Sequence, residues 1–213
     1  MKINKSKSTV YIAMSADIIH KGHMNIIRNA RKYGDVIIGL LTDRAIASYK
    51  RVPLMSFEER KEIISEISGI SKVVSQNTLD YTHNLLKLKP NYVIHGDDWK
   101  KGIQKETRKK VIKILKKWNG KLIEIKYTEG ISSTKIIRLY NQIGTTPDRR
   151  RKHLRRLIQS KKSSRFLDIH NGLSGLIVEK TKLIKKNKIE EYDGMWASSL
   201  TNSTAKGKPD IEA

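Results

Sequence analysis

The sequence predicts an α/β fold: a parallel five-stranded sheet with helices on both faces, followed by a linker helix and a smaller second part. Short apolar, β-branched segments alternate with segments of helical spacing up to about residue 142, and this alternation is typical of parallel sheets. Hydrophobic residues make up 38% of the 213 residues, enough for a buried core. After that point the composition changes, because a Gly- and Pro-containing breaker at 144–148 leads into an arginine-rich segment.

Five segments are predicted as strands. Residues 9–14 (TVYIAM) and 35–41 (DVIIGLL) are almost unbroken apolar runs, as expected of strands that are covered on both faces. Residues 71–75 (SKVVS) and 92–95 (YVIH) are short segments of the same character, and residues 122–127 (LIEIKY) form the fifth. Each is separated from the next by a segment long enough for a crossover helix.

The predicted helices have apolar residues at intervals of three and four, together with start and stop signals. One begins with a capping box at Ser56, in which Glu59 is the partner, and another ends before Pro90. A strongly basic helix stops at an Asn-Gly pair. The predicted helices cover residues 24–33, the segment behind Ser56, and residues 78–88, 105–118 and 132–142.

Charge and composition exclude several classes of protein. Lys and Arg outnumber Asp and Glu by 44 to 21, a net charge of +23 that attracts anions without choosing among nucleic acid, nucleotides, phosphorylated metabolites and acidic membranes. Cysteine is absent, which excludes disulfide scaffolds, cysteine-ligated zinc and thiol nucleophiles. No apolar run approaches the roughly 18 residues of a membrane span, and no signal peptide is evident. We expect a cytoplasmic protein without a membrane partner.

The strongest motif is His20-x-Gly22-His23, just after the first strand. Two histidines three residues apart at a helix start can face one point, where backbone N–H groups and the helix dipole already favour an anion. Gly22 allows a phosphate close to the backbone, and imidazole N–H groups can stabilise a phosphoryl group in transfer. The alternatives are two ordinary surface histidines, or a zinc pair for which no third ligand is evident.

Two further motifs follow predicted strands. Asp97 and Trp99 belong to GDDW after the fourth strand, where carboxylates can bind ribose hydroxyls, base amines or a metal ion, or simply form a solvated turn. After the fifth strand, Gly130 and the hydroxyl residues 132–134 suit a phosphate cradle, or an ordinary N-cap at Ser132. Because carboxyl ends of parallel strands meet at one edge of the sheet, we expect the three motifs to converge.

Together these motifs resemble the cytidylyltransferases of the HxGH nucleotidyltransferase superfamily, over about residues 9–140. The resemblance implies a Rossmann-like domain that transfers CMP from CTP to a phosphate or phosphonate oxygen, with Mg²⁺, and releases pyrophosphate. It implies catalytic roles for His20, His23 and either Lys50 or Arg51, with no metal-ligating side chain. The nucleotide-binding residues that it implies are Ser15, Ala16, Asp17, Gly22, Asp97, Trp99, Thr128, Gly130, Ser132, Ser133 and Thr134.

The C-terminal part resembles the opening of the phosphoenolpyruvate mutase family, which has a TIM-barrel fold, through HNGLSG at 170–175 and DGMWASSL at 193–200. The implied, incomplete substrate site consists of Trp196, Ser198, Ser199 and Asp210. Because most of a barrel is absent, we expect no mutase turnover by residues 1–213 and exposed apolar surface after about residue 165. The predicted parts are a cytidylyltransferase domain at 1–142, a basic linker at 143–165 and a mutase fragment at 166–213.

The expected acceptor is a small phosphonate. Simple members of the family have an arginine before their TEGIS motif where this chain has Tyr127, which makes glycerol 3-phosphate a poorer candidate. Fusions of the two families occur in phosphonate biosynthesis, which favours 2-hydroxyethylphosphonate, with 2-aminoethylphosphonate as runner-up. Nucleic-acid binding is the alternative of another class: the basic helix supports it, whereas an aromatic content of 6% and the absence of a recognised motif oppose it. We also expect a homo-oligomer.

Overall fold

The computed structural model describes residues 8–100, 104–126, 136, 147–185 and 188–209. Its centre is a parallel sheet of five strands in the order β3-β2-β1-β4-β5, which confirms the predicted fold class. All five predicted strands are present, with ends that differ from prediction by at most two residues. The strands are β1 (Thr9–Met14), β2 (Asp35–Leu41), β3 (Ile70–Gln76), β4 (Tyr92–Gly96) and β5 (Lys121–Ile125).

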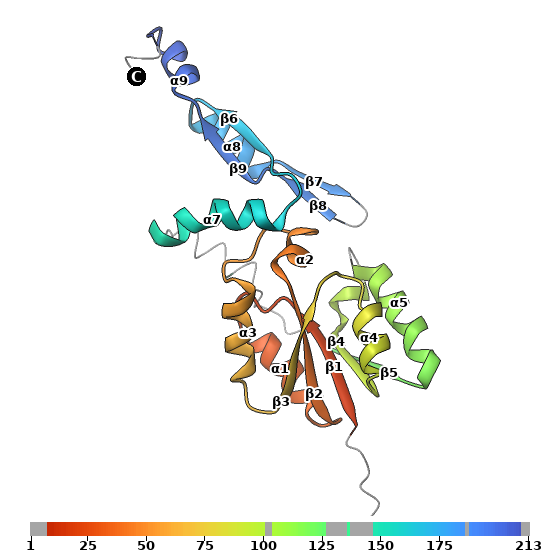
Figure 1. Ribbon diagram of the computed structural model, residues 1–213. Helices are drawn as coiled ribbons and strands as arrows, with labels where there is room; N and C mark the ends of the chain where they lie inside the picture. The colour runs from red at the N-terminus through yellow and green to blue at the C-terminus, as the bar shows by residue number, and fades with distance from the viewer. Residues whose placement is uncertain (1–7, 101–103, 127–135, 137–146, 186–187, 210–213) are drawn as a thin grey trace, which may run out of the picture.

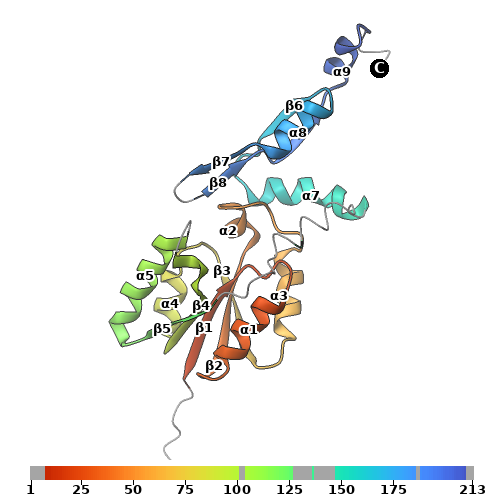
Figure 2. The ribbon, with the colours of Figure 1, turned by 180° about the vertical axis from the view of Figure 1, so that it is seen from behind.

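Helices cover both faces of the sheet (Figures 1 and 2). Alternation along β1 explains why: Val10 and Ile12 pack on the face under α1 and α3, whereas Tyr11 and Ala13 pack on the face under α2, α4 and α5. Each face therefore has its own apolar core. The helices are α1 (Lys21–Ala30), α2 (Asp43–Ala47), α3 (Phe57–Ser65), α4 (Thr82–Leu88) and α5 (Lys105–Leu115), with 3₁₀ turns η1 (Asp97–Lys100) and η3 (Lys116–Trp118).

In two helices, side-chain hydrogen bonds rather than the apolar spacing determine the first residue. Helix α1 starts three residues earlier than predicted, because the His20 side chain caps it by accepting the N–H of Gly22. Helix α4 starts four residues later than predicted, because Thr78 and Asp80 form a turn of their own before it. At α3 the predicted capping box is present, with Ser56 as N-cap.

Other differences are smaller or concern short elements. The basic helix α5 ends at Leu115 and continues to Trp118 as the 3₁₀ turn η3. The five-residue helix α2 was not predicted, since it is too short to show a helical period. Of the last predicted helix only Ile136 belongs to the described residues, and it is helical.

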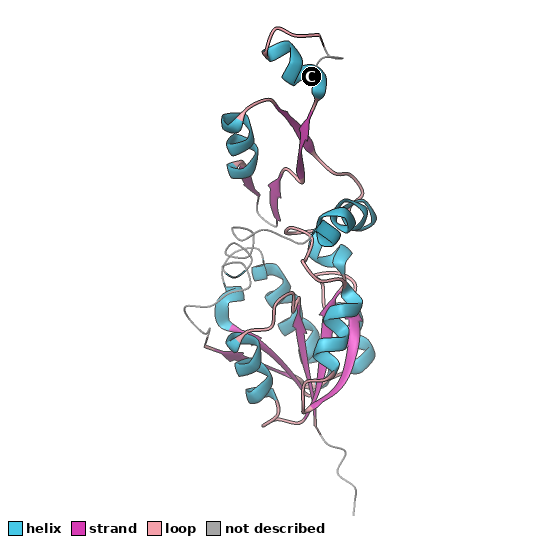
Figure 3. Cartoon of the chain, turned by 90° about the vertical axis from the view of Figure 1, so that its left-hand side faces the viewer, coloured by secondary structure: helices cyan, strands magenta, loops and turns pink. Residues whose placement is uncertain are grey.

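The second part lies beyond α7, away from the five-stranded sheet (Figures 1 and 3). Strands β6 and β9 pair in parallel, and β7 and β8 form an antiparallel hairpin. Large apolar side chains are exposed here as expected, among them Leu173, Ile184 and Trp196. The predicted barrel stays a prediction. The elements are α7 (Pro147–Ser160), β6 (Phe166–Ile169), α8 (Gly172–Lys180), β7 (Lys182–Lys185), β8 (Lys188–Glu191), β9 (Gly194–Ala197) and α9 (Ser199–Ala205).

No helix within the described ranges has the length and apolar character required to cross a membrane. The predicted boundary at residues 142 and 143 lies outside the described residues, and β6 begins at Phe166, the first residue of the predicted third part.

Candidate functional site

The strand order locates the candidate site at the carboxyl ends of β1 and β4. From β1 the chain continues to β2 and β3 on one side and then returns to β4 and β5 on the other. A reversal of this kind opens a crevice between the two central strands, where ligands of such sheets bind. Residues 15–20 follow β1 and residues 97–100 follow β4, so two of the three predicted motifs lie at this edge. The carboxyl ends of the strands point toward α2 and α7 (Figure 1).

The two histidines of the first motif lie side by side at the start of α1. The ring centroids of His20 and His23 are 4.0 Å apart and the rings are tilted by 41°. The Nδ1 atom of His20 accepts the backbone N–H of Gly22 at 3.1 Å, so in the neutral ring the proton is on Nε2. His20 therefore caps the helix with one nitrogen and has an N–H group available on the other.

Both rings are neutral near pH 7. Burial lowers the pKa of His20, and burial followed by the charges of His20 and Lys50 lowers the pKa of His23 to about 4. The buried Nδ1 atom of His23 has no hydrogen-bond partner among the described residues. A buried polar atom without a partner costs about 1–3 kcal/mol, and an oxygen atom beside Nδ1 would remove this cost.

Lys50, rather than Arg51, lies beside the histidines. The Nζ atom of Lys50 donates to Oγ of Ser15 at 3.3 Å, and its charge contributes to the lowered pKa of His23. The guanidinium of Arg51 is half exposed and pairs with Glu191 of β8 at 2.7 Å. The sequence left the choice between Lys50 and Arg51 open, and the geometry places Lys50 at the site.

A buried arginine that sequence analysis missed holds the end of β1. Arg60 of α3 is fully buried, and its Nη1 atom donates to the carbonyl oxygens of Ser15 at 2.5 Å and Leu41 at 2.8 Å. Its Nη2 atom pairs with Asp43 at 2.6 Å. The sequence signal was an arginine on the apolar face of a helix, four residues before the buried Ile64.

The loop after β1 is fixed at two further points. Ala16 is buried and has a φ of +49°, a left-handed conformation that is uncommon outside glycine. Asp17 is also buried, and its Oδ1 atom accepts the backbone N–H of Met55 at 3.1 Å. These two predicted nucleotide-binding residues shape the loop that displays Ser15 and leads to the histidines.

Trp99 and Asp97, which follow β4, differ in the exposure of their side chains. Trp99 is only 1% exposed, its Nε1 atom donates to Glu124 at 2.8 Å, and its ring stacks on His95 with centroids 3.9 Å apart. Arg108 pairs with the same carboxylate and, as the largest cause, lowers the pKa of Glu124 to about 2. Trp99 is therefore a core residue that supports the η1 turn, in which Asp97 is half-buried at the edge of the site.

The third motif cannot be placed beside the other two. The cradle residues lie outside the described residues, so their convergence with the histidines stays a prediction. They are Thr128, Gly130, Ser132, Ser133 and Thr134.

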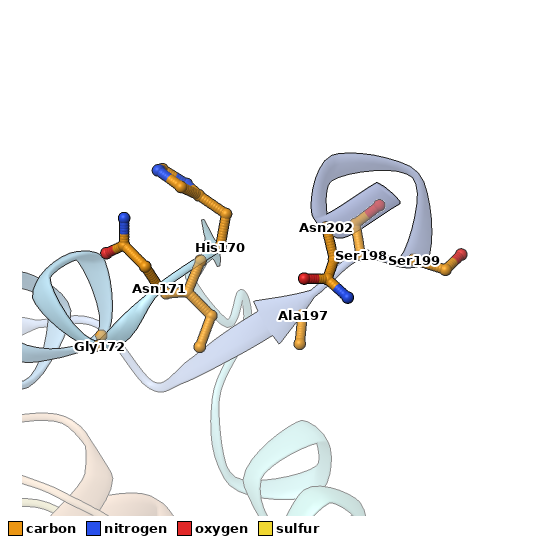
Figure 4. A pocket seen from close by; sticks show the side chains of 9 residues that line it. His170, Asn171, Gly172, Ala197, Ser198, Ser199 and Asn202 are labelled. Carbon is orange, nitrogen blue, oxygen red and sulfur yellow. The ribbon is translucent and has the colours of Figure 1, made fainter. Parts of the chain in front are cut away.

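Two of the four predicted mutase-like residues line a pocket in the second part. Ser198 and Ser199 line a pocket of about 550 Å³ at the carboxyl ends of β6 and β9 (Figure 4). Asn171, the N-cap of α8, lines it from the other side. Trp196 is 64% exposed and is not one of the lining residues, and Asp210 lies outside the described residues.

The sheet order and the histidine pair at the start of α1 define an α/β fold of the nucleotidyltransferase type. Residues 14–139 match the cytidylyltransferase-like family, and the chain belongs to this family. The mutase-like part lies outside the matched range.

Curated relatives agree with this assignment. The chain is 33% identical over 136 residues to ethanolamine-phosphate cytidylyltransferase of Dictyostelium discoideum, an alignment that covers 63% of this chain and 37% of that protein. It is 29% identical over 128 residues to FAD synthase of Archaeoglobus profundus, which covers 57% of this chain and 79% of that protein. The chain thus spans little more than a third of the length of the first relative.

Among solved structures, the lipopolysaccharide core biosynthesis protein from Thermoplasma volcanium GSS1 has the same fold, with a TM-score of 0.51 and 21% sequence identity. The superposition covers 58% of this chain and all of that protein. At this identity the similarity concerns the fold alone.

Proposed function

We propose that this chain transfers CMP from CTP to a small acceptor that bears a phosphonate or phosphate group, and releases pyrophosphate. The observation that carries the proposal is the histidine pair at the start of α1. It combines an available N–H on His20, an unpaired buried nitrogen on His23 and the nearby ammonium of Lys50. Such a group of donors at a helix N-terminus suits the oxygens of a triphosphate. The names of the cytidylyltransferase relatives support CTP as the donor.

The transfer is a direct displacement. An oxygen of the acceptor attacks the α-phosphorus of CTP in line, the bond from that phosphorus to the bridging oxygen breaks, and pyrophosphate leaves with the electron pair. No covalent enzyme intermediate is needed, because the acceptor is already an anionic nucleophile. The work of His20, His23 and Lys50 is to orient the triphosphate and to stabilise the charge that develops on it.

The family resemblance implies Mg²⁺, and the described residues offer no cage for it. Among them, no three His, Cys, Asp or Glu side chains come together as a protein-held metal site requires. Mg²⁺ is commonly bound through substrate phosphates with one or two carboxylates and water. The ion would therefore enter with CTP and neutralise phosphate charge, with Asp97 as a carboxylate at the edge of the site.

The proposed acceptor is 2-hydroxyethylphosphonate, with 2-aminoethylphosphonate and glycerol 3-phosphate as alternatives. The amine deserves an equal place in the test, because the phosphate ester of ethanolamine, named in the relatives, differs from 2-aminoethylphosphonate only by the bridging ester oxygen. The lack of an arginine at Tyr127 argues against an acceptor that depends on a guanidinium there.

The test is pyrophosphate release from CTP and Mg²⁺ with these three acceptors and ethanolamine phosphate. We expect release that requires an acceptor and prefers one of the phosphonates. ATP is the matched control donor, because the FAD synthase relatives point to an adenylyl donor as the competing specificity. Release that is equal with ATP, or absent with every acceptor, would contradict the proposal.

Lys50→Ala should lower kcat/KM by about 10- to 100-fold, because it removes a partly desolvated cation next to the histidine pair. Arg51→Ala, which removes the same charge one residue later, should change kcat/KM by less than about threefold, as is usual for a half-exposed ion pair. Steady-state kinetics of both variants measure the two changes in kcat/KM. A larger loss from Arg51→Ala would mean that the guanidinium, and not the ammonium, contacts substrate.

CTP binding should take up protons at pH 6. In the free protein burial lowers the pKa of His23 to about 4, so this ring is neutral at pH 6, and burial also lowers the pKa of His20. A bound triphosphate favours imidazolium and raises both pKa values. Calorimetry at pH 6 and pH 8, in buffers of different ionisation enthalpy, should show uptake that fades at the higher pH. Proton release, or no exchange at either pH, would mean that the triphosphate does not bind beside these rings.

We also propose that residues 166–213 are the opening of a phosphoenolpyruvate mutase domain, and that the pocket in Figure 4 is part of its substrate site. Support comes from Ser198 and Ser199, which line that pocket beside the N-terminus of α8, where an anion is favoured. We expect phosphonopyruvate to shift the NMR amide signals of both serines without turnover. Unchanged signals at millimolar ligand would reject this assignment.

A further inference from the structure

We propose that Arg156, on the linker helix α7, is a positioning residue for the nucleotide site. Through it, the segment that follows the sheet domain in the chain holds the loop that presents Lys50. The inference rests on the proposed function for its kinetic readout only, because its structural readouts can be measured without substrate.

Arg156 makes three bonds to the sheet domain. Its Nη1 atom donates to the carbonyl oxygen of Leu54 at 2.8 Å, and its Nη2 atom donates to the carbonyl oxygen of Met55 at 3.1 Å. The Nη2 atom also pairs with Oδ2 of Asp43 at 2.9 Å. The other oxygen of that carboxylate accepts from Arg60, so Asp43 is shared by one guanidinium from α3 and one from α7.

The segment held in this way touches the site at both ends. At one end, Lys50 donates to the side chain of Ser15, and at the other, the N–H of Met55 donates to Asp17. The next residue of α7, Leu157, is 3% exposed and packs in an apolar cluster with Ala47 and Val52. Helix α7 thus contacts the segment both through the guanidinium of Arg156 and through the apolar side chain of Leu157.

Loss of Arg156 leaves the carbonyl oxygen of Leu54 without its charged donor and the carbonyl oxygen of Met55 with one of its two. Arg60 still bonds to the Met55 carbonyl at 3.3 Å and to Asp43, so we expect the fold to persist while the segment between Lys50 and Met55 loosens. Lys50 then spends less time beside Ser15. Since the charge of Lys50 contributes to the lowered pKa of His23, displacement of Lys50 should raise that pKa.

The test compares Arg156→Ala with Arg155→Ala, which removes the same charge from the adjacent, exposed position of the same helix. With CTP and the best acceptor, Arg156→Ala should lower kcat/KM by about 10- to 100-fold, because small misplacements of catalytic groups have effects of this size. Arg155→Ala should stay within about twofold, as is usual for an exposed charge. Arg156→Lys should be intermediate, since an ammonium can pair with Asp43 but has no planar fork to span two carbonyls.

Two readouts do not depend on turnover. Hydrogen exchange at the amide of Met55 should become at least about tenfold faster in Arg156→Ala, as expected when a local opening becomes easier, while amides of β1 and β2 stay protected. NMR titration should show a higher pKa for His23 in the same variant. Neither should change in Arg155→Ala.

The outcomes separate this inference from the proposed function. If Arg156→Ala matches Arg155→Ala in both exchange and titration, the positioning role is wrong, whatever the enzyme activity. If both readouts move but no acceptor supports CTP turnover, the positioning role stands and the proposed function fails. Should Arg156→Ala not fold, the same two readouts on Arg156→Lys decide.

Discussion

His20→Ala and His23→Ala should each lower CTP turnover by at least about 10²- to 10³-fold, the loss that usually follows removal of one donor to a developing negative charge. The two rings lie 4.0 Å apart at a helix start that favours anions, and both are neutral, so each can offer one N–H group to the triphosphate. The measurement is kcat with CTP and the best acceptor at saturating Mg²⁺.

His20 needs a second variant, because it also caps α1. His20→Ala removes the acceptor for the N–H of Gly22, which by itself costs about 1 kcal/mol of stability. His20→Asn keeps a capping side chain but lacks the outer N–H group, so it should preserve stability and still lose turnover. His83→Ala, at an exposed position of α4, is the matched control. Turnover near that of the parent chain in both His20→Asn and His23→Ala would rule out the histidine pair as the catalytic site.

Arg60→Ala should lower the free energy of unfolding by about 3–5 kcal/mol, because removal of one partner leaves the other groups of a buried ionic network without compensation. The affected groups are the carbonyl oxygens of Ser15 and Leu41, which lose this donor, and the carboxylate of Asp43, which loses this partner and keeps its pair with Arg156. Urea denaturation monitored by tryptophan fluorescence measures the loss. Because these groups end β1 and β2, binding of CTP should weaken as well.

The control for Arg60→Ala is Lys61→Ala on the same helix. Lys61 is half exposed and lies 3.7 Å from Glu58, an arrangement that contributes at most about 1 kcal/mol. Similar losses from the two variants would show that burial of the Arg60 guanidinium does not matter for stability. A loss from Arg60→Ala below about 1 kcal/mol would point the same way.

The strands and the first motif were predictable because their signals are local. The apolar runs at 9–14 and 35–41 have few alternatives to a strand covered on both faces, and they end where predicted. The motif after β1 needed only the order of elements, since any residue after a strand of a parallel sheet reaches the same edge. The start of α1 was missed by three residues because a histidine is an unusual cap.

Other features depend on residues far apart in the sequence. Trp99 is predicted to help hold the nucleotide because it follows a strand, yet its ring is buried in an apolar cluster, stacks on His95 and bonds to Glu124. No local pattern distinguishes Lys50 from Arg51, since the ion pair of Arg51 is with Glu191, 140 positions away. The partners of these side chains are distant in the sequence and meet only in the folded chain. The roles of Trp99, Lys50 and Arg51 therefore became clear only from the tertiary structure.

The sequence by itself determined that this protein has a parallel α/β sheet with a histidine pair at a strand end. Both features follow from the apolar period and the motif spacing, which are local properties of the chain. Only the tertiary structure decided which cation joins that pair, which arginine is buried at the end of β1, and that Arg156 of the linker helix bonds to the adjacent loop. The physical reason is that a buried charge is stable only where its partners surround it, and those partners come from the loop after β1, the end of β2, and helices α2, α3 and α7.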